Sequence, residues 1–180
     1  MSAELAIKLN SDHNIDVTTG VIHISGDVDA DMYDKVVQDI SLLSQFNPDA
    51  LNNLTIYLST YGGDVYFAFA IYDYLKLTTA NLKIVCSGPV MSAGVLILQA
   101  ATERVMMPNA HLLVHFGMEV NDNQQTKHQH EQLTKEIKNL FIKRCTAKEQ
   151  TIKRWFSKES YFNTKRAVEV GLIDRVVSYE

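Results

Sequence analysis

The sequence predicts an α/β fold in which strands and helices alternate along the chain. Three apolar segments rich in β-forming residues are typical of buried strands, at 21–24, 54–58 and 82–87. Each precedes a segment with the spacing or composition of a helix, at 30–45, 65–77 and 92–101. This alternation favours helices layered on a central sheet.

Length and composition predict an ordinary globular protein. The chain has 180 residues, 46% of them apolar and 21% charged, with a net charge of −4. This length favours one domain, and the mild acidity argues against binding to nucleic acid. No apolar run approaches the roughly 20 residues of a membrane span, and the N-terminus lacks the features of a signal peptide. We therefore expect a cytoplasmic protein.

The two cysteines carry no recognisable chemistry. Cys86 and Cys145 form no metal-ligand pattern and no disulfide framework. Reduced structural thiols fit a cytosolic compartment. We expect neither a metal nor another cofactor.

The N-terminal part predicts an arm followed by a helical layer. Residues 1–20 are polar and irregular, which predicts a mobile arm before a single domain at 21–180. Asp29 or Asp31 can cap the helix at 30–45, and the Asn-Pro pair at 47–48 ends it. Apolar residues follow helical spacing in this segment: Met32, Val36, Ile40 and Leu43.

The second helix is apolar on nearly all sides. Asp64 can cap it, and few polar side chains interrupt residues 65–77. Such a helix must be covered on nearly all sides. A subunit interface and a central position in the core explain this pattern equally well.

The C-terminal half contains a long polar helix among shorter elements. Residues 122–144 have a narrow apolar stripe, so this helix either projects toward a partner or lies on the domain surface. Asn163 can cap a helix that Gly171 ends. The remaining elements are strands at 104–107, 111–115 and 172–177, and short helices at 148–155 and 164–170.

Ser92 lies at a turn between a buried strand and a helix, among small residues. A serine there can present its hydroxyl to a cleft while nearby backbone N–H groups stay free, as a nucleophile requires. Serine is also a favoured N-cap residue, which is the more common explanation for one such residue.

A nucleophilic serine needs a base, and histidine is the usual one. His111 and His115 share a strand and face the same side. They lie about 13 Å apart, so only one can contact Ser92. His115 is at the carboxyl end of its strand, where α/β sites collect.

A carboxylate should orient the histidine, and two amides should bind the oxyanion. Ala93 can supply one amide and the turn at Gly62 and Gly63 the other. Periodicity does not choose among four acidic candidates: Glu159, Asp122, Glu119 and Glu103.

Five blocks in order resemble the proteolytic subunit of the Clp protease, a self-compartmentalising serine peptidase. The serine block is Gly-Pro-Val-Met-Ser-Ala-Gly at 88–94, and the histidine block ends with Leu-Val-His at 113–115. The other blocks are at 22–28, 58–63 and 167–174. The resemblance covers about 21–177 and implies a ClpP/crotonase-like fold of repeated β-β-α units, with a projecting handle helix at about 122–145.

The resemblance assigns a role to each candidate residue. It places the nucleophile at Ser92, the general base at His115 and the catalytic acid at Glu159, where the family has aspartate. It places the oxyanion-hole amides at Gly63 and Ala93. It implies acyl transfer through an acyl-enzyme, without metal or nucleotide in this subunit.

The resemblance also implies partners. The family forms two stacked heptameric rings, a tetradecamer, which receives unfolded polypeptide from an AAA+ Clp unfoldase. Here the rings are expected to be homo-oligomeric or mixed with another ClpP-like subunit, without nucleic acid or membrane.

Three departures from the family pattern leave alternatives open. Glu159 replaces aspartate, the serine block is reordered, and 116–120 lacks the usual proline and glycine-rich run, which binds substrate and helps join the rings. A weak or inactive subunit of mixed rings is therefore one alternative. A phage-type capsid-maturation peptidase is another. An acyl-CoA enzyme of the crotonase type is disfavoured by the nucleophilic serine.

Overall fold

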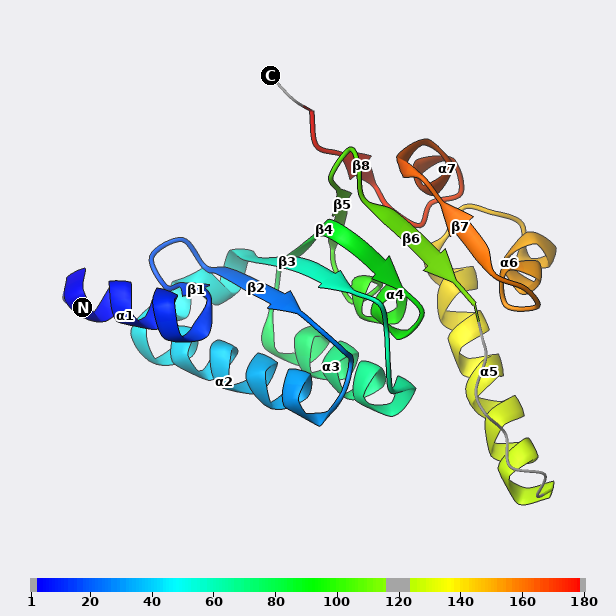
Figure 1. Ribbon diagram of the computed structural model, residues 1–180, viewed down its shortest axis with the longest axis horizontal. Coiled ribbons are helices and arrows are strands. Elements are labelled where there is room, and N and C mark those ends of the chain that lie inside the picture. Colours follow the sequence, from blue (N-terminus) through cyan, green and yellow to red (C-terminus); the bar gives the residue numbers. More distant parts are fainter. Residues whose placement is uncertain (1–2, 116–123, 179–180) are drawn as a thin grey trace.

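A mixed β-sheet forms the centre of the computed structural model, which describes residues 3–115 and 124–178 (Figure 1). Within these residues the sheet has eight strands. Its main path is β1 (Ile15–Asp16), β2 (Val21–Ser25), β3 (Leu54–Thr60), β4 (Leu82–Met91), β5 (Glu103–Met106) and β8 (Arg175–Val176). The sheet branches where β6 (His111–Val114) pairs with β4 and β7 (Ser160–Phe162) pairs with β6.

The long strand β4 creates this branch and positions the candidate site. Its first half pairs in parallel with β5, and its last residues pair in parallel with β6, with Met91 opposite Leu113. The carboxyl ends of β4 and β6 therefore lie side by side. The next residue after β4 is Ser92, and the next after β6 is His115. The topology thus brings two residues that are distant in sequence to one edge of the sheet.

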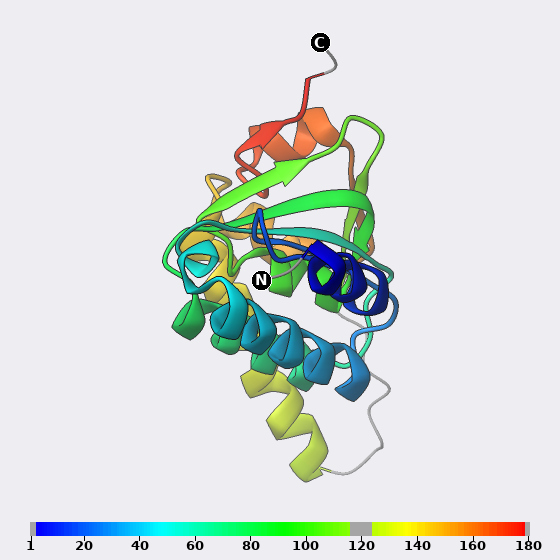
Figure 2. The same cartoon turned by 90° about the vertical axis from the view of Figure 1, so that its left-hand side faces the viewer.

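Two capped helices cover one face of the sheet (Figures 1 and 2). These are α2 (Ala30–Phe46) and α3 (Val65–Thr78), which pack against each other. Asp29 accepts a hydrogen bond from the Met32 amide and so caps α2, and Asp64 caps α3. Both predicted helices are confirmed, and the cap of α2 is Asp29. A 3₁₀ helix, η1 (Pro48–Asn53), leads from α2 to β3.

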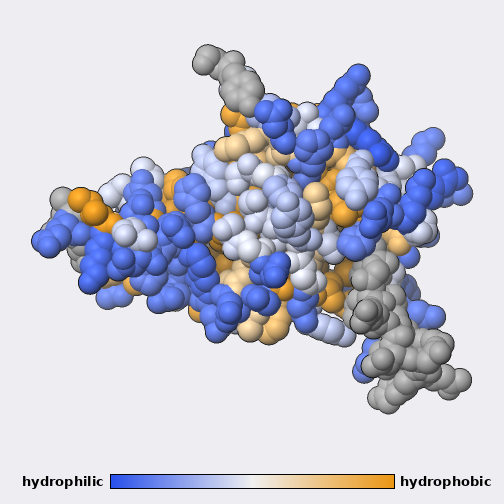
Figure 3. Space-filling view, in the orientation of Figure 1, coloured by the Kyte–Doolittle hydropathy of each residue, from blue (hydrophilic) through white to orange (hydrophobic). Residues whose placement is uncertain are grey.

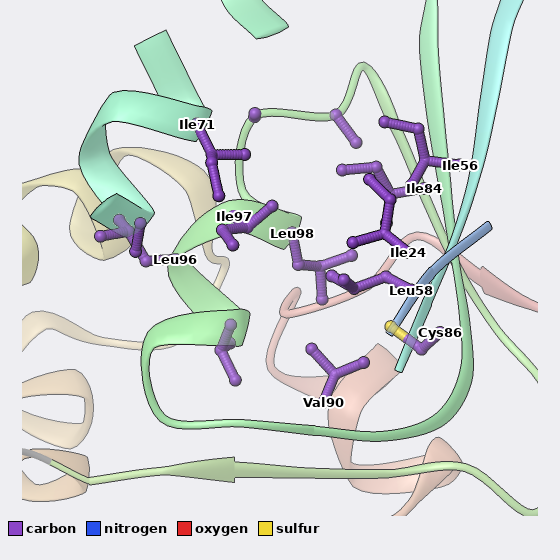
Figure 4. Packing of buried hydrophobic residues seen from close by; sticks show 14 of the residues in the cluster. Ile24, Ile56, Leu58, Ile71, Ile84, Cys86, Val90, Leu96, Ile97 and Leu98 are labelled. Carbon is purple, nitrogen blue, oxygen red and sulfur yellow. The ribbon is translucent and has the colours of Figure 1, made fainter. Parts of the chain in front are cut away.

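The short helix α4 (Ala93–Leu98) lies between the sheet and α3 (Figure 4). All six of its residues are buried. Side chains from β2, β3 and β4 point toward it, including Ile24, Leu58 and Ile84. Burying apolar area at about 25 cal/mol per Å² makes this contact a main source of stability. The start of α4, and with it the candidate site, is therefore attached to the core.

The N-terminal arm is more ordered than the sequence predicts. The segment 1–20, predicted as a mobile arm, contains regular structure in its described part, because α1 (Ala3–His13) is helical and β1 pairs with β2. Its mobility stays a prediction. Leu9, Ile15 and Val17 are buried in the main core. These three apolar side chains pack in the core, although the segment is mostly polar and its composition did not indicate such contacts.

The long helix α5 (Gln124–Arg144) extends away from the body of the protein at its N-terminal end (Figures 1 and 2). Its C-terminal half is attached to the domain, because Leu133, Ile137 and Phe141 are buried. Of the two predicted alternatives, the structure therefore favours a projecting helix, with its C-terminal half attached to the domain. The helices α6 (Glu149–Trp155) and α7 (Thr164–Glu169) follow it.

The helix α3 is only partly covered. Ala68, Ile71 and Leu75 are buried, whereas Tyr66 and Leu77 are exposed. Apolar patches interrupt a mostly hydrophilic surface on the face that Figure 3 shows. A core position thus explains one side of α3, and a subunit interface for the rest stays a prediction.

Some predicted boundaries differ from the structure. The helix expected at 92–101 covers only 93–98, and the final strand is reduced to 175–176. The strand β7 was not predicted, because the sequence indicates a loop at 157–160 before the helix at 164–170. Its three residues are too few for the alternation of a strand to be detected. No helix among the described residues is long and apolar enough to cross a membrane.

Candidate active site

Ser92 adopts a backbone conformation that is rare for a residue with a side chain. Its φ is 52° and its ψ is −123°. Strained backbone of this kind costs about 1–3 kcal/mol and persists only where the surroundings enforce it. The Ser92 amide donates a 2.8 Å hydrogen bond to the Leu113 carbonyl, which ties the turn to β6. Ser92 is the N-cap residue of α4 by position, but its side chain makes no capping hydrogen bond, so capping does not occupy the hydroxyl.

Glycines on both sides of the serine allow the backbone to pack closely. A Cβ at Gly62 would lie 2.6 Å from the Ser92 Cβ, and Gly62 has a φ of 106°. A Cβ at Gly94 would collide with the Thr60 side chain. Only glycine fits these two positions, because the chain after β3 and the start of α4 are in contact there.

Ser92 and His115 line the same pocket. The pocket has a volume of about 180 Å³ and lies between the start of α3, the start of α4 and the end of β6. Both residues are half-buried, as a nucleophile and a base that must meet substrate require. Much of the pocket lining is apolar and includes Leu96, Val114, Ile137, Phe141 and Phe156.

His111 does not share this pocket. Its ring nitrogen Nδ1 lies 3.0 Å from the Asn109 carbonyl oxygen, and the side chain is exposed. The choice of His115 over His111 as the candidate base therefore agrees with the position of the two rings.

Two backbone amides beside the serine have no hydrogen-bond acceptor within residues 3–115 and 124–178. Among the described residues, neither the Gly63 amide nor the Ala93 amide donates a hydrogen bond. The bridge between Val28 and Gly63 uses the amides of Val28 and Asp64 instead, which leaves the Gly63 N–H unused. Gly63 and Ala93 both line the pocket. Two unpaired N–H groups beside a serine are what an oxyanion hole requires.

Glu159 lies next to the end of β6, with its carboxylate bonded to a tyrosine. Antiparallel pairing places Ser160 opposite Val114, so continuing the register by one residue places Glu159 opposite His115. The Tyr161 hydroxyl donates a 3.3 Å hydrogen bond to Glu159 Oε2. The negative charge of Glu159 and this hydrogen bond raise the pKa of Tyr161.

The other acidic candidates divide into two groups. Glu103 is at the start of β5 and accepts a 2.6 Å hydrogen bond from Arg175, so it is committed elsewhere. Glu119 and Asp122 lie outside the described residues, as does the 116–120 segment. Glu159 is thus the candidate acid that the described structure places beside the histidine strand.

The described residues include no group of three or more His, Cys, Asp and Glu side chains that could hold a metal ion. Burial raises the pKa of Cys86 to about 12, which makes this thiol a poor nucleophile.

Sequence reasoning missed two contributors to the site. The first is the contact of Gly62 with Ser92, which joins segments 30 residues apart. The adjacent pair Gly62 and Gly63 was the only indication of it in the sequence. Tyr161 follows Glu159 at strand spacing, which would have been a signal if β7 had been predicted.

A strained serine between a strand and a helix, with a histidine and two free amides in one pocket, is the arrangement of serine hydrolases on α/β scaffolds. The family model for Clp protease matches residues 11–180. The chain therefore belongs to the Clp protease family and is a Clp-type serine peptidase subunit.

Individual relatives agree with this family. The chain is 25% identical over 169 residues to an ATP-dependent Clp protease proteolytic subunit from Deinococcus radiodurans, covering 87% of this chain and 79% of that protein. The structure of a ClpP1 mutant from Listeria monocytogenes has a TM-score of 0.83 with 20% identity, covering 98% of this chain and 97% of that one. The second likeness concerns the fold alone, and it confirms the predicted α/β architecture.

Proposed function

We propose that this chain hydrolyses unfolded polypeptides with Ser92 as nucleophile, His115 as general base and Glu159 as the acid that orients it. One observation carries the proposal: Ser92 and His115 follow neighbouring parallel strands and line one pocket with two unused amides. Substrate carbonyl oxygen would be bound by the amides of Gly63 and Ala93.

The mechanism follows from these positions. His115 accepts the Ser92 proton as the hydroxyl oxygen attacks the carbonyl carbon. The oxyanion forms beside the two amides, which need no reorganisation to stabilise it. The C–N bond breaks as His115 returns its proton to the leaving amine. Water then attacks the acyl-enzyme by the same route and releases the second product.

The apolar residues that line the pocket support a preference for substrates with an apolar side chain beside the scissile bond. Leu96, Ile137 and Phe141 line the pocket, and Phe141 packs edge-on against Phe156 at 5.3 Å between ring centroids. An apolar substrate side chain beside the scissile bond would bury its surface there, at about 25 cal/mol per Å².

The functional form in this proposal is an oligomer in the cytoplasm. Family membership and the name of the Deinococcus radiodurans relative support ATP-dependent action with a Clp ATPase. We infer two stacked heptameric rings served by an AAA+ Clp unfoldase. The incompletely covered α3 provides apolar surface for contacts between subunits.

The decisive experiment combines assembly with chemistry. Native mass spectrometry gives the oligomeric state of the wild type and of Ser92→Ala, and a fluorogenic peptide gives their turnover. We expect equal assembly, with turnover and fluorophosphonate labelling lost only in the variant. An assembled wild type that never labels at Ser92 would count against the proposal.

A second candidate function is that of a weak or inactive subunit in mixed rings. Among the described residues no hydrogen bond joins Ser92 to His115 or His115 to Glu159, and the Glu159 carboxylate is bonded to Tyr161. Assembly with an active ClpP-like subunit, together with no labelling of this chain in those rings, would favour that function.

A further inference from the structure

Tyr161 is the described residue that holds the candidate acid. Its hydroxyl donates to Glu159 Oε2, and among the described residues this carboxylate accepts no other hydrogen bond. The second oxygen, Oε1, therefore has no hydrogen-bond donor in the part of the chain that the structure describes. Glu159 and Tyr161 are both exposed, whereas Ser160 between them is buried. This alternation places the two side chains on one side of β7.

The pairing of β6 with β7 places the same two residues beside the histidine. Tyr161 is directly opposite Leu113, and continuing the register places Glu159 opposite His115. Directly opposite residues of an antiparallel pair project to the same face. The histidine, the acid and the tyrosine thus share one face of a two-strand ribbon.

The backbone of Tyr161 is itself fixed. Arg166 donates a 2.8 Å hydrogen bond to the Tyr161 carbonyl oxygen, and its guanidinium lies over the Phe162 ring at 4.4 Å. Phe162 is fully buried. The tyrosine hydroxyl is therefore presented from a strand that is anchored in the core.

We propose that Tyr161 is a positioning residue that holds Glu159 Oε2 and thereby directs Oε1 toward the His115 ring. Glutamate has one more rotatable bond than aspartate, so its carboxylate samples more positions. A second hydrogen-bond donor restricts this freedom and lets the longer acid serve the histidine. This inference rests on the proposed function of Glu159 and His115.

The test is Tyr161→Phe in the assembled full-length protein. We expect kcat for a fluorogenic peptide to fall about three- to tenfold, the equivalent of one ordinary solvent-exposed hydrogen bond, with KM unchanged. The acidic limb of the profile of kcat/KM against pH should move to lower pH, because the carboxylate then supports charged His115 less. The other polar groups near these residues, Asp64 and Tyr66 in the pocket lining and Arg166 beside β7, are not substituted in this variant.

Two further variants separate positioning from general damage. Tyr57→Phe removes a tyrosine hydroxyl from β3, outside the pocket, and should leave kcat unchanged. In a Glu159→Asp background the shorter acid no longer reaches the tyrosine, so adding Tyr161→Phe should have no further effect.

An unchanged kcat and pH limb in Tyr161→Phe would overturn the inference. An increased kcat would overturn it as well, because Tyr161 would then hold the acid away from His115. An NMR titration of ¹³C-labelled histidine in Ser92→Ala keeps the test independent of turnover. In this background, Tyr161→Phe should lower the pH at the midpoint of the His115 titration, even if the proposed peptidase activity fails. An unchanged midpoint would overturn this inference and leave the proposed function untouched.

Discussion

Gly62 and Ser92 are in such close contact that a Cβ on the glycine would lie 2.6 Å from the Cβ of the serine. Real Cβ atoms do not approach this closely, so any side chain at position 62 displaces the serine. The proposed nucleophile, Ser92, is therefore positioned by a glycine 30 residues earlier in the chain as well as by its own turn.

We predict that Gly62→Ala reduces turnover by about 100-fold or more, because a displacement near 1 Å at a reacting group has that effect. A fluorogenic peptide assay on the assembled protein measures it. Gly26→Ala is a matched control, since Gly26 has nearly the same φ of 108° but nothing lies within 4 Å of an added Cβ. Equal losses in both variants would attribute the effect to backbone strain and contradict the role of the contact.

Local patterns predicted the elements that carry the site. The caps at Asp29, Asp64 and Asn163 are observed where the sequence placed them, because a side chain and an amide two or three residues later suffice to form them. Ser92 and His115 were identified through short blocks at strand ends, and the parallel pairing of β4 and β6 then brings those ends together.

Contacts between distant segments were not predictable in the same way. The hydrogen bond from Tyr161 to Glu159 depends on β7, which exists because β6 pairs with it. The burial of Leu9 likewise depends on the core beneath α1, and no local pattern in that polar segment reveals it. Tertiary packing decides such elements.

The proposed role of Glu159 as the catalytic acid gives a second prediction. Glu159→Gln should reduce kcat more than tenfold, since a neutral amide supports a charged histidine poorly. Glu103→Gln should leave kcat near that of the wild type, because Glu103 bonds Arg175 at the other end of the sheet. Peptide turnover of both variants at one pH measures this difference. A larger loss of kcat in Glu103→Gln than in Glu159→Gln would contradict the assignment of Glu159 as the catalytic acid.

A third prediction concerns the buried Arg104. Its guanidinium donates to the Gly171 carbonyl at 2.8 Å and to Gln99 Oε1 at 2.9 Å, and it forms an ion pair with Asp174. Arg104→Leu leaves these acceptors without their donor and should lower the free energy of unfolding by about 3 kcal/mol.

Arg175→Leu is the control for this prediction, and urea denaturation compares the two variants. Arg175 is 52% exposed and pairs with Glu103, which is 41% exposed. An exposed pair of this kind contributes about 0.2–1 kcal/mol. If both variants lost a similar amount of unfolding free energy, the burial of Arg104 would not explain its contribution to stability.

The two thiols give a fourth prediction. Burial raises the pKa of Cys86 to about 12 and that of Cys145 to about 11. At pH 8 few thiolates form, so iodoacetamide should modify the native protein slowly and the urea-unfolded protein completely. Mass spectrometry of the intact chain measures the modification. Rapid reaction of the native protein at pH 8 would contradict it.

The last prediction uses two carboxyl groups whose pKa values shift in opposite directions. Burial acts to raise the pKa of Asp174, but hydrogen bonds and charge from Arg104 outweigh burial, so the pKa falls below its ordinary value of 3.8. Burial raises the pKa of Asp39 despite its 2.6 Å ion pair with Lys35. The stability that Asp174 contributes is therefore present above about pH 4 and is lost as the pH falls through its folded pKa.

Asp39 has the opposite sign, because its folded form binds the proton more readily than its unfolded form. The difference in unfolding free energy between wild type and Asp174→Asn should therefore shrink as the pH falls from 5 toward 2. The corresponding difference for Asp39→Asn should move in favour of the wild type as the pH falls toward about 4, because the folded carboxyl binds its proton above the ordinary pKa of 3.8, and it should change little at lower pH. Urea denaturation at a series of pH values measures both differences, and parallel slopes for the two variants would contradict the assignment of ion pairing to one group and burial to the other.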